Sequence, residues 1–426
     1  MTDRIGGAQR WSLALLFMAG TLNLFDRTIV NVLGEQIKTE LVISDAQLGL
    51  LTGTAFGLLY SVAIVPIARL ADRTNRVWVI ASALTAWSAC TALCGLAGNF
   101  IQLFLARMGV GMAEAGGQPA SVSLVRDLFP EGRRASATAI LLVGAPAGAC
   151  LGLLLGGFMG TTWGWRIALF AAAVPGLVVA AMMFLTMRDP VGDPGRKTET
   201  GTLLEAVKIL GRRRSLLWLT VAFACQTFCL FATAAWLPPF FIRAHDMTAL
   251  EVGRFLGLAV GLGGAVGALG VGFLCDHFRR RGRPRDWLLI KIVMVANLPL
   301  IALTVLTPSL SVALACVIAL SMTVYGYLGP IPVLIQQQAT SGTRSLSLGG
   351  VTAVANIMSM CIGVPTVGLL SDTLHPYFGA PAVGYALAIM IGAAALIGLV
   401  ALGQAQKSAV DPAATADDPK VAEALP

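Results

Sequence analysis

The chain has 426 residues, of which 56% are hydrophobic and 12% are charged, and its mean hydropathy is +0.78. Soluble globular domains carry about 25% charged residues, so this composition excludes a soluble protein and indicates an integral membrane protein. The net charge of +8 does not indicate nucleic-acid binding, because most of the 30 Lys and Arg residues fall in the N-terminus, the tail and alternate loops. Under the positive-inside rule this distribution predicts that both termini lie in the cytoplasm.

Apolar stretches long enough to cross a bilayer as a helix, about 20 residues each, recur along the chain. They predict an all-α membrane protein with twelve transmembrane helices, which begin near Trp11, Ala46, Val77, Asn99, Ala135, Gly164, Leu216, Leu250, Trp287, Leu310, Ser345 and Ala380. The first stretch follows two arginines, as the core of a signal peptide would, but it is longer than such a core and lacks a clear cleavage site. We therefore expect it to be retained as the first helix.

The eight cysteines lie nearly all inside the expected spans, and the sequence contains no Cys-x-x-Cys pair. Cysteines in apolar helices usually serve as small packing residues, so we expect no disulfide, no metal site and no cofactor. The loops are short and the sequence has no Asn-x-Ser/Thr sequon. These features favour a bacterial inner (plasma) membrane.

A short pattern occurs twice along the chain. Residues 68–76 read Ala-Arg-Leu-Ala-Asp-Arg-Thr-Asn-Arg, and residues 272–280 read Gly-Phe-Leu-Cys-Asp-His-Phe-Arg-Arg. Leu, Asp and the final Arg recur at the same spacing. Because each copy follows the second helix of a set of six, the repeat predicts two pseudo-symmetric six-helix bundles.

We expect the N-terminal bundle at residues 1–190 and the C-terminal bundle at 214–404. The segment between them, 191–213, contains Gly-Asp-Pro-Gly and a basic run, which is typical of a cytoplasmic linker with a short surface helix around 203–210. The last residues, 405–426, are rich in Ala, Asp and Pro and predict a disordered cytoplasmic tail.

Four ionisable residues lie inside expected spans: Asp26 and Arg27 in the first, and Arg107 and Glu114 in the fourth. A charge at the middle of a bilayer costs at least about 2.5 kcal/mol, so such residues usually serve function and have partners. Arg107 and Glu114 are close to two helical turns apart and share a face, with Gly111 between them leaving room. Counting helical rises predicts two pairs, Asp26 with Arg107 and Arg27 with Glu114.

The alternative is a fixed ion network that only holds the first and fourth helices together. Buried ion pairs are often replaceable by apolar residues without loss of stability, which argues against a purely structural role. A low dielectric favours the protonated carboxyl group, whereas a nearby guanidinium favours the charged one. The protonation of such a carboxyl group therefore depends on geometry.

The repeated loop pattern resembles the loop between helices two and three of the major facilitator superfamily, usually Gly-x-x-x-Asp-Arg-x-Gly-Arg-Arg. Ala68, Asn75 and Val77 depart from the two glycines and the last basic residue, whereas Asp72 and Arg73 match. Four further segments resemble the spinster group of this superfamily: Asn23-Leu-Phe-Asp26-Arg27, Arg107-Met-Gly-Val-Gly-Met-Ala-Glu114-Ala-Gly-Gly-Gln-Pro119, Asp127-Leu-Phe-Pro-Glu-Gly-Arg133-Arg134 and Trp163-Gly-Trp-Arg166. The superfamily resemblance covers nearly the whole chain.

This resemblance implies a secondary active transporter that works by alternating access and moves an amphipathic lysolipid or sphingolipid-like substrate. It also implies that Glu114 and Asp26 are proton-coupling residues. Arg27 and Arg107 would hold these carboxylates or meet an anionic headgroup, because arginine stays charged and its planar fork suits phosphate. Among the four, we expect Glu114 to matter most.

The expected substrate cavity has further polar candidates, each of which is alone more often satisfied in helix packing than in contact with a ligand. They are Asn23, Gln118, Gln226, Tyr325 and Asn356. The second half has no acidic residue inside its spans, so we expect a cavity charged on one wall and apolar on the other. Such a cavity suits an amphipathic molecule.

The repeated loops predict a gate on the cytoplasmic side. Asp72 would meet the start of the eleventh helix near Arg344, and Asp276 would meet the start of the fifth near Arg134. The same gate would include Arg73, Arg76 and Arg280. The alternative is that these loop charges only enforce topology.

Glycines recur every four residues along the expected fifth and eighth helices, at Gly144, Gly148, Gly152 and Gly156 and at Gly257 and Gly261. Small residues at this spacing permit close helix packing. In the superfamily these two helices face each other, so the ridges would let the halves rock. The alternative is plain tight packing.

Other functions stay open at this point. The alternative cargo is a small organic anion, moved with protons. A lipid-modifying enzyme is disfavoured, because the sequence has no His-Glu-x-x-His, Gly-x-Ser-x-Gly or phosphate-binding loop motif. A receptor or sensor without turnover is a third class. As partners we expect an amphipathic or anionic small molecule, protons and the lipid bilayer, with no nucleic acid, and we expect a monomer.

Overall fold

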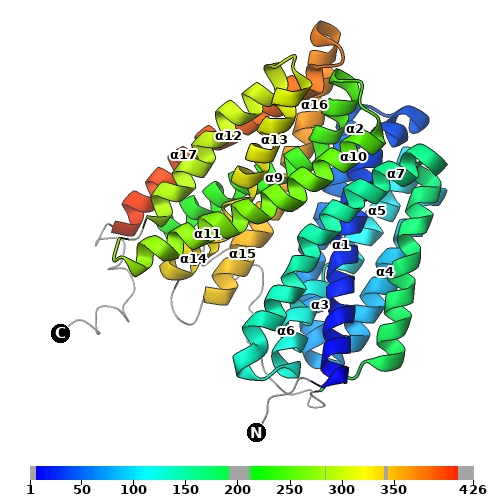
Figure 1. Ribbon diagram of the computed structural model, residues 1–426, viewed down its shortest axis with the longest axis vertical. Helices are drawn as coiled ribbons and strands as arrows, with labels where there is room; N and C mark the ends of the chain where they lie inside the picture. The colour runs from blue at the N-terminus through cyan, green and yellow to red at the C-terminus, as the bar shows by residue number, and fades with distance from the viewer. Residues whose placement is uncertain (1–5, 191–210, 212, 284, 340–343, 411–426) are drawn as a thin grey trace. The chain divides into compact units, whose positions relative to one another are not determined.

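The structure is a computed structural model that describes the chain except residues 1–5, 191–210, 212, 284, 340–343 and 411–426. The described residues are almost entirely helical and contain no strand (Figure 1). This confirms the expected all-α membrane fold. The predicted linker, apart from Gly211 and Arg213, and its surface helix lie outside the described residues.

The helices of the first part of the chain are α1 (Gly7–Leu41), α2 (Asp45–Gly49), η1 (Leu50–Thr54), α3 (Ala55–Arg73), α4 (Arg76–Leu96), α5 (Phe100–Glu114), α6 (Gly117–Leu128) and α7 (Glu131–Thr186). Those of the remainder are α9 (Arg214–Ala244), α10 (Ala249–Leu258), η2 (Ala259–Gly263), α11 (Gly264–Arg280), α12 (Asp286–Leu306), α13 (Leu310–Tyr325), α14 (Pro330–Gln338), α15 (Arg344–Asn356), η3 (Ile357–Gly363), α16 (Val364–Phe378) and α17 (Ala382–Val410). The last helix continues past residue 404, so the predicted tail begins later than expected, and its remainder lies outside the described residues.

Ten helical stretches of the described residues are long and apolar enough to cross a membrane. One of them, α7, contains Gly164 with φ of 80°, a left-handed conformation that glycine adopts without strain, and this residue divides α7 into two spans. The pair α5 and α6, broken after Glu114, supplies one more. The result is the twelve spans expected from the sequence.

Three spans contain a π-helical turn, η1, η2 and η3. A π turn holds an extra residue and is often found at functional sites. The turns η1 and η3 divide two spans that contact one another, as described below.

The described helices belong to two compact units. The first unit comprises 1–200, 232–261 and 360–387, and the second comprises 201–231, 262–359 and 388–426. The first unit therefore holds α1 to α7, α10 and α16 together with one end each of α9, η2, η3 and α17. The expected division at 190 and 214 into two bundles stays a prediction.

Within the first unit, the glycine ridge of α7 packs against α1. A Cβ on Gly148 would overlap the Thr21 carbonyl oxygen, and one on Gly152 would overlap Thr28. The expectation that this ridge meets the eighth helix was wrong, because a four-residue spacing defines a face but not its neighbour. The helix α10 instead meets a different face of α7, where Gly253 approaches the Leu153 carbonyl and Gly257 approaches the Cys150 carbonyl.

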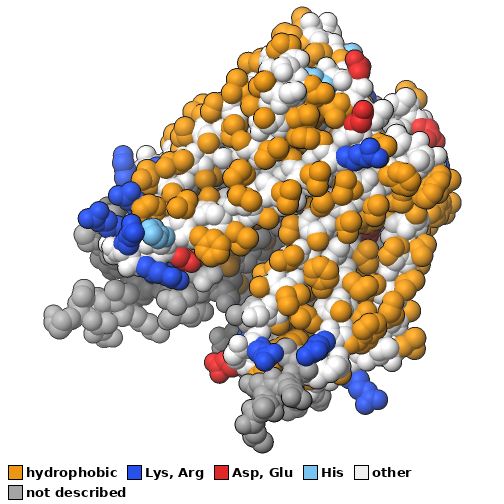
Figure 2. All heavy atoms as spheres, viewed as in Figure 1, with side chains coloured by type: hydrophobic (Ala, Val, Ile, Leu, Met, Phe, Trp, Pro, Cys, Tyr) orange, Lys and Arg blue, Asp and Glu red, His pale blue; other side chains and the backbone are white. Residues whose placement is uncertain are grey.

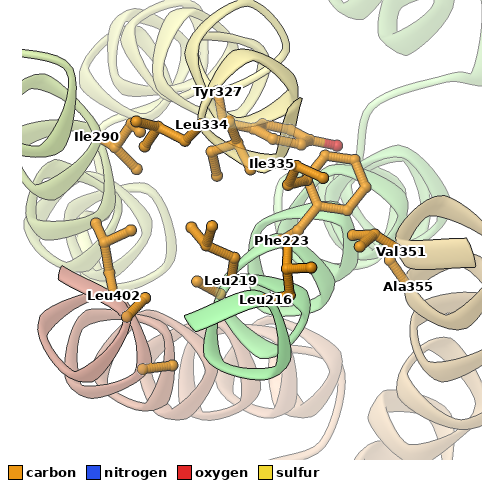
Figure 3. Packing of buried hydrophobic residues seen from close by; sticks show 14 of the residues in the cluster. Leu216, Leu219, Phe223, Ile290, Tyr327, Leu334, Ile335, Val351, Ala355 and Leu402 are labelled. Atoms are coloured by element: carbon orange, nitrogen blue, oxygen red, sulfur yellow. The ribbon is translucent and has the colours of Figure 1, made fainter. Parts of the chain in front are cut away.

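The second unit has a continuous apolar core. Leu219, Ile290, Leu334 and Leu402 converge from α9, α12, α14 and α17, and all are at most 2% exposed (Figure 3). Phe223 and Tyr327 pack edge to face in the same core, with ring centroids 5.4 Å apart. This packing fixes the helices that carry the polar candidates of the second half.

The outer surface of the helices is apolar. Trp163, Ile167 and Val174 on α7 each expose more than half of their surface. Figure 2 shows hydrophobic side chains over most of the visible face, with Lys and Arg mainly near helix ends. Surface of this kind is stable against lipid and costly against water, as expected of a multi-pass membrane protein.

Candidate functional site

Glu114 is held by two side chains of α1. Asn23 and Arg27 lie one turn apart on that helix, so they share a face. The Arg27 Nε and the Asn23 Nδ2 each donate a hydrogen bond of 2.8 Å to the Glu114 Oε2. The side chain of Glu114 is fully buried, and that of Arg27 is 16% exposed. The structure thus contains the expected pairing of Arg27 with Glu114.

Asp26 points from α1 to another helix, α4. The Thr91 Oγ1 donates a hydrogen bond of 3.3 Å to the Asp26 Oδ2. Asp26 and Arg107 are each 2% exposed and interact electrostatically. The described residues show no ion pair between them, so only one of the two expected pairs is formed.

Several buried polar atoms of this cluster have no hydrogen-bond partner among the described residues. They are Asp26 Oδ1, Trp87 Nε1, Arg107 Nε and Glu114 Oε1. An unsatisfied buried group costs about 1–3 kcal/mol, more when it is charged. The choice between a fixed ion network and a functional cluster stays a prediction.

An aromatic pair completes the cluster. Phe56 and Tyr60 stack with centroids 5.3 Å apart, and the Arg27 Cζ lies 4.2 Å from the Phe56 centroid and 4.7 Å from the Tyr60 centroid. The Arg107 Cζ lies 5.6 Å from the same Phe56 ring. One ring therefore serves two guanidinium groups by cation–π attraction. Sequence reasoning missed Phe56, although two aromatic residues four apart on one span were a usable signal.

Gly111 brings α5 against this ring. A Cβ at this position would overlap the Phe56 carbonyl oxygen. The helix can therefore approach the backbone of α3 only because the residue is glycine. The close approach places Arg107 over Phe56, and it confirms that Gly111 makes room between the two charged residues of α5.

Of the polar candidates in the second unit, Gln226 is engaged in helix packing. Asn297 donates to the Gln226 Oε1 at 3.2 Å, and the Gln226 Nε2 donates to the Thr323 carbonyl at 3.3 Å. Gln226 is also only 1% exposed. These contacts are those of a polar residue satisfied in helix packing. Tyr325 and Asn356 are half-buried, and Gln118, in the first unit, is exposed. Their contact with substrate stays a prediction.

Among the predicted gating residues, Arg76 has the clearest contacts. It is 7% exposed, and its guanidinium donates to Asp189 at 2.6 and 3.1 Å, to Asp127 at 2.6 Å and to Ser123 at 3.1 Å. These bonds join α4, α6 and the segment after α7 within the first unit. Arg76 therefore cross-links these three segments. Its part in a gate stays a prediction.

The other gating residues show less. Arg73 is exposed, and the Arg134 Nε donates to the Phe129 carbonyl at 3.1 Å. Asp276 is 60% exposed and lies 3.9 Å from Arg279, one turn away. The side chains of Asp72 and Arg344 lie outside the described residues, and Arg280 ends α11. The gate contacts predicted from these residues stay predictions.

Sequence reasoning missed a second polar cluster, which we call the Asp45 cluster. Its members are Glu35, Lys38, Asp45, Arg243, Ser371 and Asp372. All six belong to the first unit and lie where spans one, two, seven and eleven meet. Charges near the ends of spans usually set topology, so the sequence carried no signal that these residues bind one another.

Charges buried within apolar spans usually mark an ion or substrate pathway. A family model described as Major Facilitator Superfamily matches residues 16–363, and the chain belongs to this superfamily. The chain is 32% identical over 402 residues to an MFS-type efflux pump of Mycolicibacterium smegmatis, and the match covers 93% of each chain. It is also 26% identical over 303 residues to a probable galactarate/D-glucarate transporter of Bacillus subtilis, covering 64% of this chain and 66% of that one.

Among solved structures, the fold is similar to that of a bacterial homologue of the human lysosomal transporter Spinster, in an inward-facing and unoccupied conformation. The TM-score is 0.79 at 26% identity, and the match covers 95% of this chain and 99% of that chain. This confirms the resemblance to the spinster group. These relatives are transporters, and none of them is an enzyme.

Proposed function

We propose that this protein is a proton-coupled secondary transporter that moves an amphipathic lysolipid or sphingolipid-like substrate by alternating access. The single observation that carries the proposal is the buried Glu114 carboxylate, which binds Arg27 through one oxygen and leaves the other without a partner. A group that is held by a cation yet incompletely satisfied is suited to gain and lose a proton.

The geometry gives a physical route to coupling. When Glu114 takes up a proton, its negative charge disappears and Arg27 loses its counter-ion, whereas the guanidinium stays charged. Arg27 and Arg107 then present two positive charges around the Phe56 ring. An anionic headgroup stabilises that state by charge-assisted hydrogen bonds, and loss of the proton restores the Arg27–Glu114 pair. Proton and anion binding are therefore linked.

Asp26 is the second proposed protonation site. Its carboxylate accepts a hydrogen bond from Thr91 on α4, and it interacts electrostatically with both Arg107 and Glu114. A proton on one carboxyl group therefore changes the energy of a charge on the other. We infer that the two carboxyl groups titrate as a coupled pair.

The similarity to the spinster homologue supports the lysolipid or sphingolipid-like cargo that this resemblance implies. The similarity to a galactarate/D-glucarate transporter favours a second candidate, a small organic anion moved with protons. Both cargoes carry an anionic group that two arginines can bind. They differ in whether the remainder of the molecule is apolar.

Proteoliposomes containing a pH-sensitive dye separate these cargoes. We expect lysophospholipids to stimulate proton flux, and a panel of sugar acids and other carboxylates to have no effect. Flux driven only by the carboxylates would replace the lipid cargo with the organic anion. Binding of either ligand without exchange of labelled substrate would identify a receptor or sensor, and would overturn the transport proposal.

We further propose that the protein is a monomer in a bacterial inner membrane. The distribution of basic residues favours a topology with both termini in the cytoplasm. The end of the first unit that carries Val42, between α1 and α2, would then face outward. A membrane-impermeant thiol reagent should label Val42→Cys in intact cells, because Val42 is 89% exposed. Labelling only after the membrane is permeabilised would indicate the opposite topology.

A further inference from the structure

We propose that the Asp45 cluster is a latch that keeps the α1–α2 end of the transporter closed and must break once in every transport cycle. The inference rests on the proposed alternating access. It assigns a function to six residues that lie far along the helices from the Arg27–Glu114 pair. The latch joins helices of both predicted halves within the first compact unit.

Asp45 is the centre of the latch. Its carboxylate accepts hydrogen bonds from Arg243 Nη1 and Nη2, each at 2.7 Å, and from the Ser371 Oγ at 2.6 Å. It also accepts one from the Lys38 Nζ. Asp45 is 1% exposed, so these contacts replace almost all of its hydration. One carboxylate thus ties α2 to α1, α9 and α16.

Arg243 links a second acid to the same centre. Its Nη2 donates both to Asp45 and to Glu35, which belongs to α1. A planar guanidinium suits this geometry, because it offers several donors in fixed directions. The end of α9 is thereby held to α1 and α2 together.

Asp372 makes the complementary contact from α16. Its two carboxylate oxygens accept the backbone N–H groups of Asp45 at 2.9 Å and of Ala46 at 2.8 Å. These N–H groups open the second span, where a helix end attracts negative charge. The neighbouring residue, Ser371, bonds to the Asp45 side chain, so the two helix ends clasp each other in both directions.

The helices beneath the latch touch through glycine. A Cβ on Gly53 would overlap the Met360 carbonyl oxygen, and one on Gly368 would overlap the Asp45 carbonyl oxygen. The Thr54 Oγ1 donates to the Cys361 carbonyl at 2.9 Å, which joins η1 to η3. Smooth glycine surfaces pack closely but interlock little. The ion pairs of the latch are therefore the directional contacts that resist separation.

The latch is connected to the Arg27–Glu114 pair through two continuous spans. The helix α1 carries Arg27 and, farther along, Glu35 and Lys38. The second span begins at Asp45 and continues through η1 to Phe56, which lies against Arg27. A shift of either span that follows protonation or substrate binding therefore also displaces latch residues.

Removing one partner of a buried ion pair is strongly destabilising, because the other charge stays buried without compensation. Asp45→Asn or Arg243→Gln should therefore weaken the closed state relative to the open one. Glu40→Gln is the matched control. Glu40 lies at the same end of α1 and pairs with an arginine, Arg166, but that arginine belongs to α7. Its loss should leave the clasp between α2 and α16 intact.

The test measures opening directly by pulsed electron spin resonance. Spin labels at Thr39 and Thr373, both exposed, are placed in a full-length chain whose eight cysteines are replaced by alanine. Minor conformations are commonly populated at about 0.1–10%, so we expect either latch variant to raise the long-distance population at least about tenfold. Glu40→Gln should give the parent distribution. Parent-like distances in both latch variants, or an equal change in the control, would overturn the latch.

Hydrogen exchange in the unlabelled protein gives a second measurement. The Asp45 and Ala46 amides are bonded to Asp372, so a broken latch should speed their exchange at least about tenfold. Arg243→Lys, which keeps the charge but loses the planar guanidinium, provides a milder variant if Arg243→Gln does not fold.

Neither readout needs a substrate or a proton gradient. Loss of proton coupling with normal latch behaviour would refute only the proposed function, and unchanged exchange and distances with normal transport would refute only the latch.

Discussion

Arg27 and Glu114 are joined by one hydrogen bond, from Nε to Oε2, at 2.8 Å. Asn23 donates to that same oxygen. The amide of glutamine can keep an oxygen at this position, so Glu114→Gln removes the charge and the titrating group with little change in shape. We expect this variant to stay folded and purifiable, with a loss of stability of about 3 kcal/mol because Arg27 loses its counter-ion.

Proton-coupled transport by Glu114→Gln should be abolished, whereas substrate exchange without a gradient should persist. The measurements are proton flux and counterflow of labelled substrate in the same proteoliposomes. Thr304→Val is a control for the loss of a buried polar group, because Thr304 is 0% exposed and bonds to the Leu300 carbonyl of its own helix in the second unit. Normal coupling in Glu114→Gln would make Glu114 a structural residue.

Phe56→Leu should weaken the binding of an anionic substrate and lower stability. The ring contacts two guanidinium groups, each worth about 0.5–2 kcal/mol. We expect a total loss of stability of about 2–4 kcal/mol, measured by thermal unfolding in detergent. Phe223→Leu is the matched control, since Phe223 is buried in the second unit against Tyr327 and no cation of the described residues lies over its ring. Phe56→Leu should raise the substrate Kd, and Phe223→Leu should leave it unchanged. An equal rise in both variants would contradict a specific role of Phe56 in binding.

Gly111→Ala should separate α5 from α3. The added methyl group would overlap the Phe56 carbonyl oxygen, and overpacking of this kind costs about 1–3 kcal/mol. Gly270→Ala is the comparison, because a Cβ there meets no atom within 4 Å and alanine has the higher helix propensity. Gly270→Ala should therefore unfold at the same or a higher temperature than the parent, and Gly111→Ala at a lower one. Equal Tm values for the two variants would contradict the close approach.

Arg76→Gln should destabilise the first unit by about 3–5 kcal/mol, because Asp189 loses its bidentate partner and Asp127 loses a 2.6 Å contact. Arg73→Gln, at an exposed position in the same loop, should change stability by less than about 0.5 kcal/mol. Thermal unfolding of the purified variants compares them. If Arg76→Gln is as stable as the parent but impaired in transport, Arg76 acts in a gate and not as a structural cross-link.

The features that depend on position along a helix could be predicted from the sequence. Depth counting placed Arg27 against Glu114 because rises along two helices are regular, and the same regularity showed that Gly111 separates two charged residues. What each face meets could not be predicted in this way. The ridge from Gly144 to Gly156 packs on α1, which a four-residue spacing alone does not specify.

Some residues owe their importance to neighbours far along the chain, and their own segment does not show what those neighbours are. The spacing of Phe56 and Tyr60 indicates an aromatic face but not the arginines that it meets. Phe56 is an ordinary apolar residue until two arginines are placed over its ring. Asp45 and Arg243 are 198 positions apart in the chain. Each alone is a charge near the end of a span. Only the packing of α2, α9 and α16 brings them together.

The π turn η1 lies between Asp45 and Phe56 on one span. It holds an extra residue, and each residue of an α-helix advances the chain by about 100° around the axis. Conversion of η1 to α geometry with Phe56 held in place would therefore swivel the Asp45 carboxylate by about 100°, away from Arg243. A change of geometry in η1 would thus turn one charge cluster of the second span relative to the other.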